Sequence, residues 1–248
     1  MIVIHIDSQS DTAFLKKTYE GLENITLLYN PTKEQVNDAL KASPTEDVMM
    51  LGHGSPSGLF SADWRGNVID ATNANLLKGR NCVGIWCWAK KFAKNYGLKG
   101  YFTSMFISNA GEAKGYGYYG HTEEEIFNEV ELFSIRINNL IKNGRPQDEW
   151  VGALQADADM SKDFVKYNYE NMEYFDGTQK ADFAPTLFDS DYLPRDYTAD
   201  VETTDDDEVD MWFEDYCYEH GIEGEWAREI AYPIFVAGWN SYKYAQEM

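Results

Sequence analysis

Short runs of β-branched and aliphatic residues alternate with helical segments throughout the first hundred residues, and the connections between them are short. This alternation is typical of a mostly parallel sheet with helices on both faces. We therefore predict an α/β fold. The expected strands are Ile2 to Ile6, Ile25 to Tyr29, Val48 to Leu51, Cys82 to Trp86 and Tyr101 to Ser108, and the expected helices between them are Thr12 to Leu22, Asn30 to Ala42, Asn73 to Lys78 and Ala89 to Tyr96.

The pattern changes to a helical one at Thr122, where an N-cap and an acidic first turn precede apolar residues at helical spacing up to Gly144. A run of Asp and Glu near residue 205 is typical of a solvated linker, and an aromatic, helical pattern follows it. We predict one α/β domain over 1–200, with a core at 1–145, a helical extension at 146–175 and an irregular segment at 176–200, followed by an acidic linker and helical hairpin over 201–248.

The 248 residues include 21 basic and 42 acidic side chains, a net charge of −21 at pH 7. Residues 1–100 are nearly neutral, with 11 basic and 10 acidic side chains, so residues 101–248 carry the excess. A phosphate backbone would be repelled, so we expect no direct nucleic-acid binding. The acidic region 101–248 suits a basic protein partner instead.

The apolar runs are too short to span a bilayer, so we expect no membrane segment. The N-terminus reads as a first strand and lacks the basic start of a signal peptide. The three cysteines, Cys82, Cys87 and Cys217, are too few for a disulfide framework. These features together predict a cytoplasmic protein.

Two candidate chemical groups follow predicted parallel strands. His53-Gly54 comes after the strand at 48–51, and Cys87 comes after the strand at 82–86. Sites in open α/β sheets are built at the carboxyl ends of the strands. A cysteine that begins the next helix is favoured as a thiolate by the helix N-terminus, and a neighbouring histidine accepts the thiol proton. The pattern predicts a Cys–His nucleophile pair.

A hydrophobic strand, His-Gly, about thirty residues, a second hydrophobic strand and Cys resembles the caspase-like cysteine peptidases, a group that includes caspases, gingipains, clostripain, legumain, separase and CHAT-domain peptidases. The resemblance covers roughly residues 1–145. It implies that His53 is the general base and acid and that Cys87 attacks a peptide carbonyl. It further implies an oxyanion hole made by the backbone N–H groups of Gly54 and Cys87. The implied substrate is a protein or peptide, and no cofactor is needed.

The residues around the cysteine depart from that family, whose members usually have a small residue before it. Two indoles beside the nucleophile either shape a narrow apolar site or fill it. An arginine in the substrate pocket would select an acidic P1 side chain and an aspartate a basic one, and the sequence leaves this choice open. The candidate pocket residues are Asp63, Arg65, Trp86, Trp88, Ser108 and Asn109.

Two alternative functions are also compatible with the same fold. One is a non-catalytic acidic binding protein that mimics DNA or inhibits a basic partner, as anti-defence proteins of phages and mobile elements do. The other is a small-ligand binder with a vestigial Cys–His pair. The GxGxxG match over 115–120 follows the fifth predicted strand, so it predicts a surface loop and not a dinucleotide site. Cys217 and His220 lack the further ligands of a zinc site, so we expect no metal.

Overall fold

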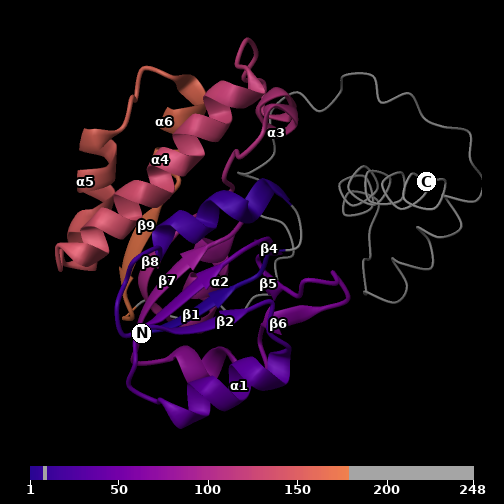
Figure 1. Cartoon of the computed structure of the whole chain (residues 1–248), viewed down its shortest axis with the longest axis vertical. Coiled ribbons are helices and arrows are strands. Elements are labelled where there is room, and N and C mark those ends of the chain that lie inside the picture. Colours follow the sequence, from indigo (N-terminus) through magenta and orange to yellow (C-terminus); the bar gives the residue numbers. More distant parts are fainter. Residues whose placement is uncertain (8–9, 179–248) are drawn as a thin grey trace, which may run out of the picture. The chain divides into compact units, whose positions relative to one another are not determined.

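The computed structural model describes residues 1–7 and 10–178, which lie in one compact unit, Met1–Pro185. Its centre is a six-stranded sheet in the order β2-β1-β3-β7-β8-β9 (Figure 1). Five strands are parallel and β9 runs antiparallel to β8 at one edge. The predicted α/β fold with a mostly parallel sheet is confirmed. The strands are β1 (Ile2–His5), β2 (Thr26–Tyr29), β3 (Val48–Leu51), β7 (Asn81–Ile85), β8 (Lys99–Phe102) and β9 (Glu173–Asp176).

A second, three-stranded antiparallel sheet lies in the chain between β3 and β7. It consists of β4 (Gly54–Ser55), β5 (Gly58–Phe60) and β6 (Asn67–Ile69). From the sequence this segment is expected to be a loop, because it is rich in Gly, Ser and Asp. Such short strands carry too few residues for a period-two pattern to show.

Alternate residues of each strand enter two cores on opposite faces of the sheet. Val3, Met49 and Ile85 pack with η1 (Ser10–Thr18), α4 (Glu123–Lys142), α5 (Trp150–Asp157) and α6 (Asp163–Glu170). Ile4, Met50 and Trp86 pack with α1 (Lys33–Ala42), η2 (Ala74–Leu77), α2 (Ala89–Tyr96) and the small sheet. Figure 1 shows α4, α5 and α6 together on one side and α1 on the other.

Several boundaries differ from the expected ones. The segment after β1 is the 3₁₀ helix η1, and β8 ends at Phe102, so residues 103–108 are not strand. The predicted helical stretch from 147 to 175 is divided into η3 (Gln147–Glu149), α5, α6 and the strand β9. The GxGxxG segment comprises the last residue of α3 (Ala110–Gly115) and the turn after it. The predicted linker and hairpin over 201–248 lie outside the described residues.

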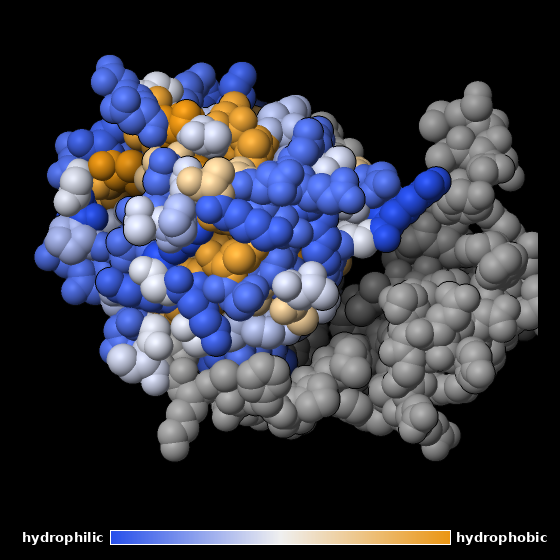
Figure 2. All heavy atoms as spheres, turned by 90° about the horizontal axis from the view of Figure 1, so that it is seen from below, coloured by the Kyte–Doolittle hydropathy of each residue, from blue (hydrophilic) through white to orange (hydrophobic). Residues whose placement is uncertain are grey.

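The described surface is largely hydrophilic when seen from the α1 end, with separate hydrophobic patches between the polar side chains (Figure 2). Helix α1 contributes to this polarity because it buries Val36 and Leu40 and turns its charged residues outward. In residues 1–7 and 10–178, no helix has both the length and the apolar character to cross a membrane.

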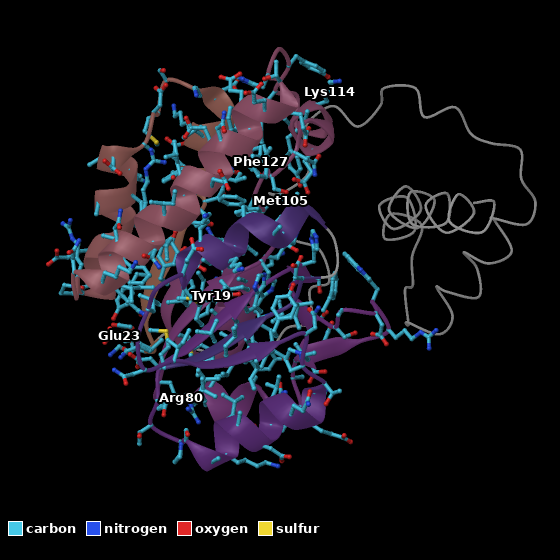
Figure 3. All side chains as sticks on the ribbon, viewed as in Figure 1. Tyr19, Glu23, Arg80, Met105, Lys114 and Phe127 are labelled. Carbon is cyan, nitrogen blue, oxygen red and sulfur yellow. The ribbon has the colours of Figure 1, made fainter. Side chains whose placement is uncertain are left out.

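The buried side chain of Arg80 joins three segments on the α1 side of the sheet (Figure 3). Its Nε donates to the carbonyl of Leu76 at 2.8 Å, and its terminal nitrogens donate to the carbonyls of Leu40, Ser43 and Glu46 at 2.6, 2.6 and 3.0 Å. The guanidinium therefore satisfies backbone carbonyls at the end of α1, where the helix leaves them without partners.

We expect Arg80→Met to destabilise the domain by about 3–5 kcal/mol, because it leaves several buried carbonyls without donors. Urea unfolding followed by circular dichroism measures this loss. The same substitution at the exposed Arg145, which pairs with Glu149 four residues on, is the control and should cost about 0.5 kcal/mol or less. Equal costs for the two variants would contradict this account of Arg80.

His5 is fully buried at the end of β1, between the rings of Tyr19 and Tyr29. Its Nδ1 lies 2.9 Å from the hydroxyl of Tyr19, a residue labelled in Figure 3. Burial lowers the pKa of His5 below its ordinary value, and burial raises the pKa of Tyr19 to about 12. The folded protein therefore holds His5 neutral at pH values where the unfolded chain is already protonated.

Stability should fall as the pH drops through about 6.5, the unfolded pKa of histidine, toward the lower folded pKa of His5. The variant His5→Asn removes the titrating group and keeps a polar atom near Tyr19. Its unfolding free energy should therefore decline less between pH 7.5 and pH 5.5 than that of the natural protein. Parallel declines would show that His5 does not contribute to the pH dependence.

Candidate catalytic site

The pairing of β3 with β7 brings the two candidate groups to one edge of the sheet. Leu51 and Ile85 are partners in the parallel ladder, and the Gly52 N–H extends it by donating to the Ile85 carbonyl at 3.2 Å. His53 and Cys87 each follow two residues after these partners. Gly52 has φ 146°, and an added Cβ would lie 2.8 Å from the Ile6 carbonyl oxygen. Only glycine therefore permits this exit from the strand.

Cys87 lies in the turn between β7 and α2, one residue before the helix N-cap, Trp88. The expectation that the cysteine itself begins the helix is therefore wrong. The helix begins at Ala89, two residues after Cys87, and the N-cap Trp88 between them adopts a left-handed conformation with φ 72°. The backbone N–H of Lys90, in the first turn, donates to the Thr103 carbonyl at 2.7 Å. The thiol is half-buried and still close to the positive end of α2.

A small pocket of about 30 Å³ lies at this edge. This volume is small, enough for one or a few water molecules, and the pocket is open to solvent. The structure brings His53 and Cys87 together in its lining. The other lining residues are Thr12, Phe14, Leu15, Gly52, Ile85, Trp86, Phe106, Ser108 and Glu112.

The indole of Trp86 packs into the core on the α2 face, and Trp86 also lines the pocket. Its Nε1 donates to the Ser55 carbonyl at 3.2 Å, and its backbone is held by Thr103. A Cβ on Gly54 would lie 2.1 Å from Cδ1 of the indole. Trp86 therefore packs against the backbone of the small sheet, which explains a large residue before the cysteine.

The backbone of Gly54 is oriented by its pairing with β5. Gly54 is opposite Leu59, and the Phe60 N–H donates to the His53 carbonyl at 2.9 Å. This bond makes Gly54 and Leu59 a non-hydrogen-bonded pair, in which the N–H groups point away from the partner strand. The Gly54 N–H is thus directed out of the small sheet.

The candidate residues Asp63 and Arg65 do not line the pocket. They lie in the exposed turn between β5 and β6, where Asp63 accepts hydrogen bonds from the Ser61 hydroxyl at 2.6 Å and the Arg65 N–H at 3.2 Å. The bond from Ser61 lowers the pKa of Asp63. The residue of this turn that reaches the site is Trp64, whose ring centroid lies 5.1 Å from that of His53.

Of the two candidate residues that follow β8, Ser108 and Asn109, only Ser108 lines the pocket. The N–H and hydroxyl of Ser108 donate to Oε2 of Glu112 at 2.7 and 3.0 Å. Asn109 is the N-cap of α3 and accepts the Glu112 N–H at 2.9 Å, so it serves the helix. Glu112 is not among the site residues predicted from the sequence. A glutamate three residues after an N-cap is a recognisable signal of a helix start.

Trp88 is half-buried beside Cys87, and the ammonium of Lys91 lies 5.6 Å from its ring centroid. Phe14, Leu15 and Phe106 form the apolar wall of the pocket and were also missed, because their sequence neighbourhood resembles ordinary core. Within the part of the chain that the structure describes, no group of three or more His, Cys, Asp and Glu side chains gathers as metal ligands.

The fold and this edge define the class of the protein. It is an α/β domain with a mostly parallel six-stranded sheet and a histidine and a cysteine at the carboxyl ends of neighbouring strands. No protein-family model matches the sequence, and the comparison with curated proteins finds no match.

The contact between Trp86 and Gly54 generates a stability prediction. Gly54→Ala should destabilise the domain by about 1–3 kcal/mol, because the new methyl group overlaps the buried indole. Gly66→Ala in the β5–β6 turn is the control, since an added Cβ there meets nothing within 4 Å and should change stability by about 0.5 kcal/mol or less. Thermal unfolding of both variants measures the difference, and equal effects would refute the contact.

Proposed function

We propose that the domain is a caspase-like cysteine endopeptidase in which Cys87 is the nucleophile and His53 the general base and acid. The observation that carries this proposal is their shared pocket at the ends of the paired strands β3 and β7. The mostly parallel sheet and the order of the two groups along the chain agree with the resemblance to that family. The proposed setting is the cytoplasm, where the thiol stays reduced.

In the proposed reaction, His53 takes the proton of the Cys87 thiol, and the thiolate attacks the carbonyl carbon of a peptide bond. The carbonyl oxygen becomes an oxyanion, which the N–H groups of Gly54 and Cys87 stabilise. Each such donor typically contributes about 3–4 kcal/mol. His53 then protonates the leaving amine, and a thioester to Cys87 remains. Water hydrolyses the thioester, and its proton returns to the pair.

Two structural features support these roles. The Gly54 N–H points out of the small sheet and is not used in the β4–β5 ladder, although Gly54 itself does not line the pocket. The N-terminus of α2 lies next to Cys87, and its partial positive charge favours the thiolate over the thiol.

The first test is the pH dependence of iodoacetamide labelling at Cys87, mapped by peptide mass spectrometry. We expect labelling to rise well below pH ~8.5, the ordinary thiol pKa, and to move up to it in His53→Ala. Cys82 is the internal control: it is buried and burial raises its pKa to about 12, so native protein should leave it unlabelled.

A reactive Cys87 would be followed by a peptide-substrate screen, in which Cys87→Ala must abolish cleavage and Cys82→Ala must not. If Cys87 labels no faster than an ordinary thiol, and His53→Ala changes nothing, the peptidase proposal is wrong. The proposal is then replaced by the non-catalytic acidic binding protein, which predicts salt-sensitive binding of a basic protein that Cys87→Ala leaves unchanged.

A further inference from the structure

The indole of Trp64 lies against the imidazole of His53. The ring centroids are 5.1 Å apart with a tilt of 36°, and the ring of Phe60 supports the indole at 5.3 Å. Trp64 is nevertheless 47% exposed. It therefore places a large aromatic surface at the site instead of burying it in either core.

The backbone of Trp64 is also held in an unfavourable conformation. Its φ is 60°, in the left-handed region that bulky residues seldom adopt. The turn enforces it: the Ser61 N–H donates to the Gly66 carbonyl at 2.8 Å, and the Trp64 N–H donates to the Ser61 carbonyl at 3.1 Å. Backbone strain combined with apolar exposure does not help folding, and such positions gather at functional sites.

A histidine that exchanges a proton must present one ring nitrogen to its partner in a defined direction. The tight exit at Gly52 fixes where the His53 backbone lies, but the direction of the ring depends on what packs against it. The indole covers one side of the imidazole and restricts its rotation. An aromatic pair in this tilted arrangement is attractive beyond its burial of area.

We propose that Trp64 is a positioning residue that holds the His53 imidazole in the orientation for proton exchange with Cys87. The proposal rests on the proposed function of that pair. It assigns the β5–β6 turn a role in the site, and it explains why a tryptophan occupies a left-handed position there.

The test uses the full-length chain and two readouts. The first is the pH profile of Cys87 labelling in Trp64→Ala, Trp64→Phe and Arg65→Ala. The second is the NMR signal of the His53 ring protons, which the indole ring current shifts when the rings are in contact. Arg65→Ala is the matched control, because it alters the same turn and leaves the indole in place.

We expect Trp64→Ala to move the labelling profile toward that of His53→Ala. Because only the thiolate reacts, the labelling rate at pH 6 should fall about tenfold if the pKa of Cys87 rises by about one. The His53 ring signals should lose their ring-current shift in the same variant. Trp64→Phe should restore most of both readouts, and Arg65→Ala should change neither.

Four outcomes would overturn the inference. Unchanged His53 signals in Trp64→Ala would show that the rings do not meet in solution. An unchanged labelling profile in a protein whose profile does depend on His53 would show that the contact has no consequence. Faster labelling of Trp64→Ala with an unchanged pH profile would show that Trp64 only shields the Cys87 thiol from the reagent. An unreactive Cys87 in the natural protein refutes the proposed function and the positioning role with it, and the NMR readout then still decides the ring contact.

Discussion

The parallel, in-register pairing of β1, β3 and β7 is the constraint on which the candidate site depends. Main-chain hydrogen bonds keep Leu51 level with Ile85, so the residues that follow them leave the sheet at the same height. Neither His53 nor Cys87 needs a direct bond to the other to be brought close. The cores on the two faces of the sheet secure this register, because a slip by one residue would turn every buried side chain to the wrong face.

The small sheet lies beside this edge and contacts two residues of the site. It is fastened to β7 by the packing of Trp86 against Gly54 and by the bond from the indole to Ser55. The turn between β5 and β6 places Trp64 against His53. One buried tryptophan therefore anchors the base of the β4–β6 sheet, while an exposed one touches the site from its tip.

The strands β1, β2, β3 and β7 were predictable from sequence because each is an apolar run bounded by clear turn signals. The pairing of His53 with Cys87 in one pocket followed from the same argument. The strand β9 was not predictable, since the residues before it have helical spacing and its partner β8 is about 70 residues away in the chain. Long-range pairing of this kind leaves no local signal.

The pocket lining was predicted less well than the pair. Ser108, Trp86 and the pair itself line it, whereas Asp63, Arg65 and Asn109 are engaged in a turn or a helix cap. Polar and charged residues in loops are typical of substrate specificity, but these three stabilise local backbone structure instead. The walls come from Phe14 and Phe106, which a sequence cannot distinguish from core residues until the tertiary fold places them.

The two residues that follow β7 have different surroundings. Trp86 packs in the core shared with α2 and also lines the pocket, whereas the next residue, Cys87, lines the pocket and is only half-buried. Because the two residues are adjacent and line one pocket, the effects of replacing both should not simply add. The packing of Trp86 against Phe92 and Gly54 does not involve the side chain of Cys87. The frame of the site is therefore held by contacts that the chemistry proposed for Cys87 does not supply.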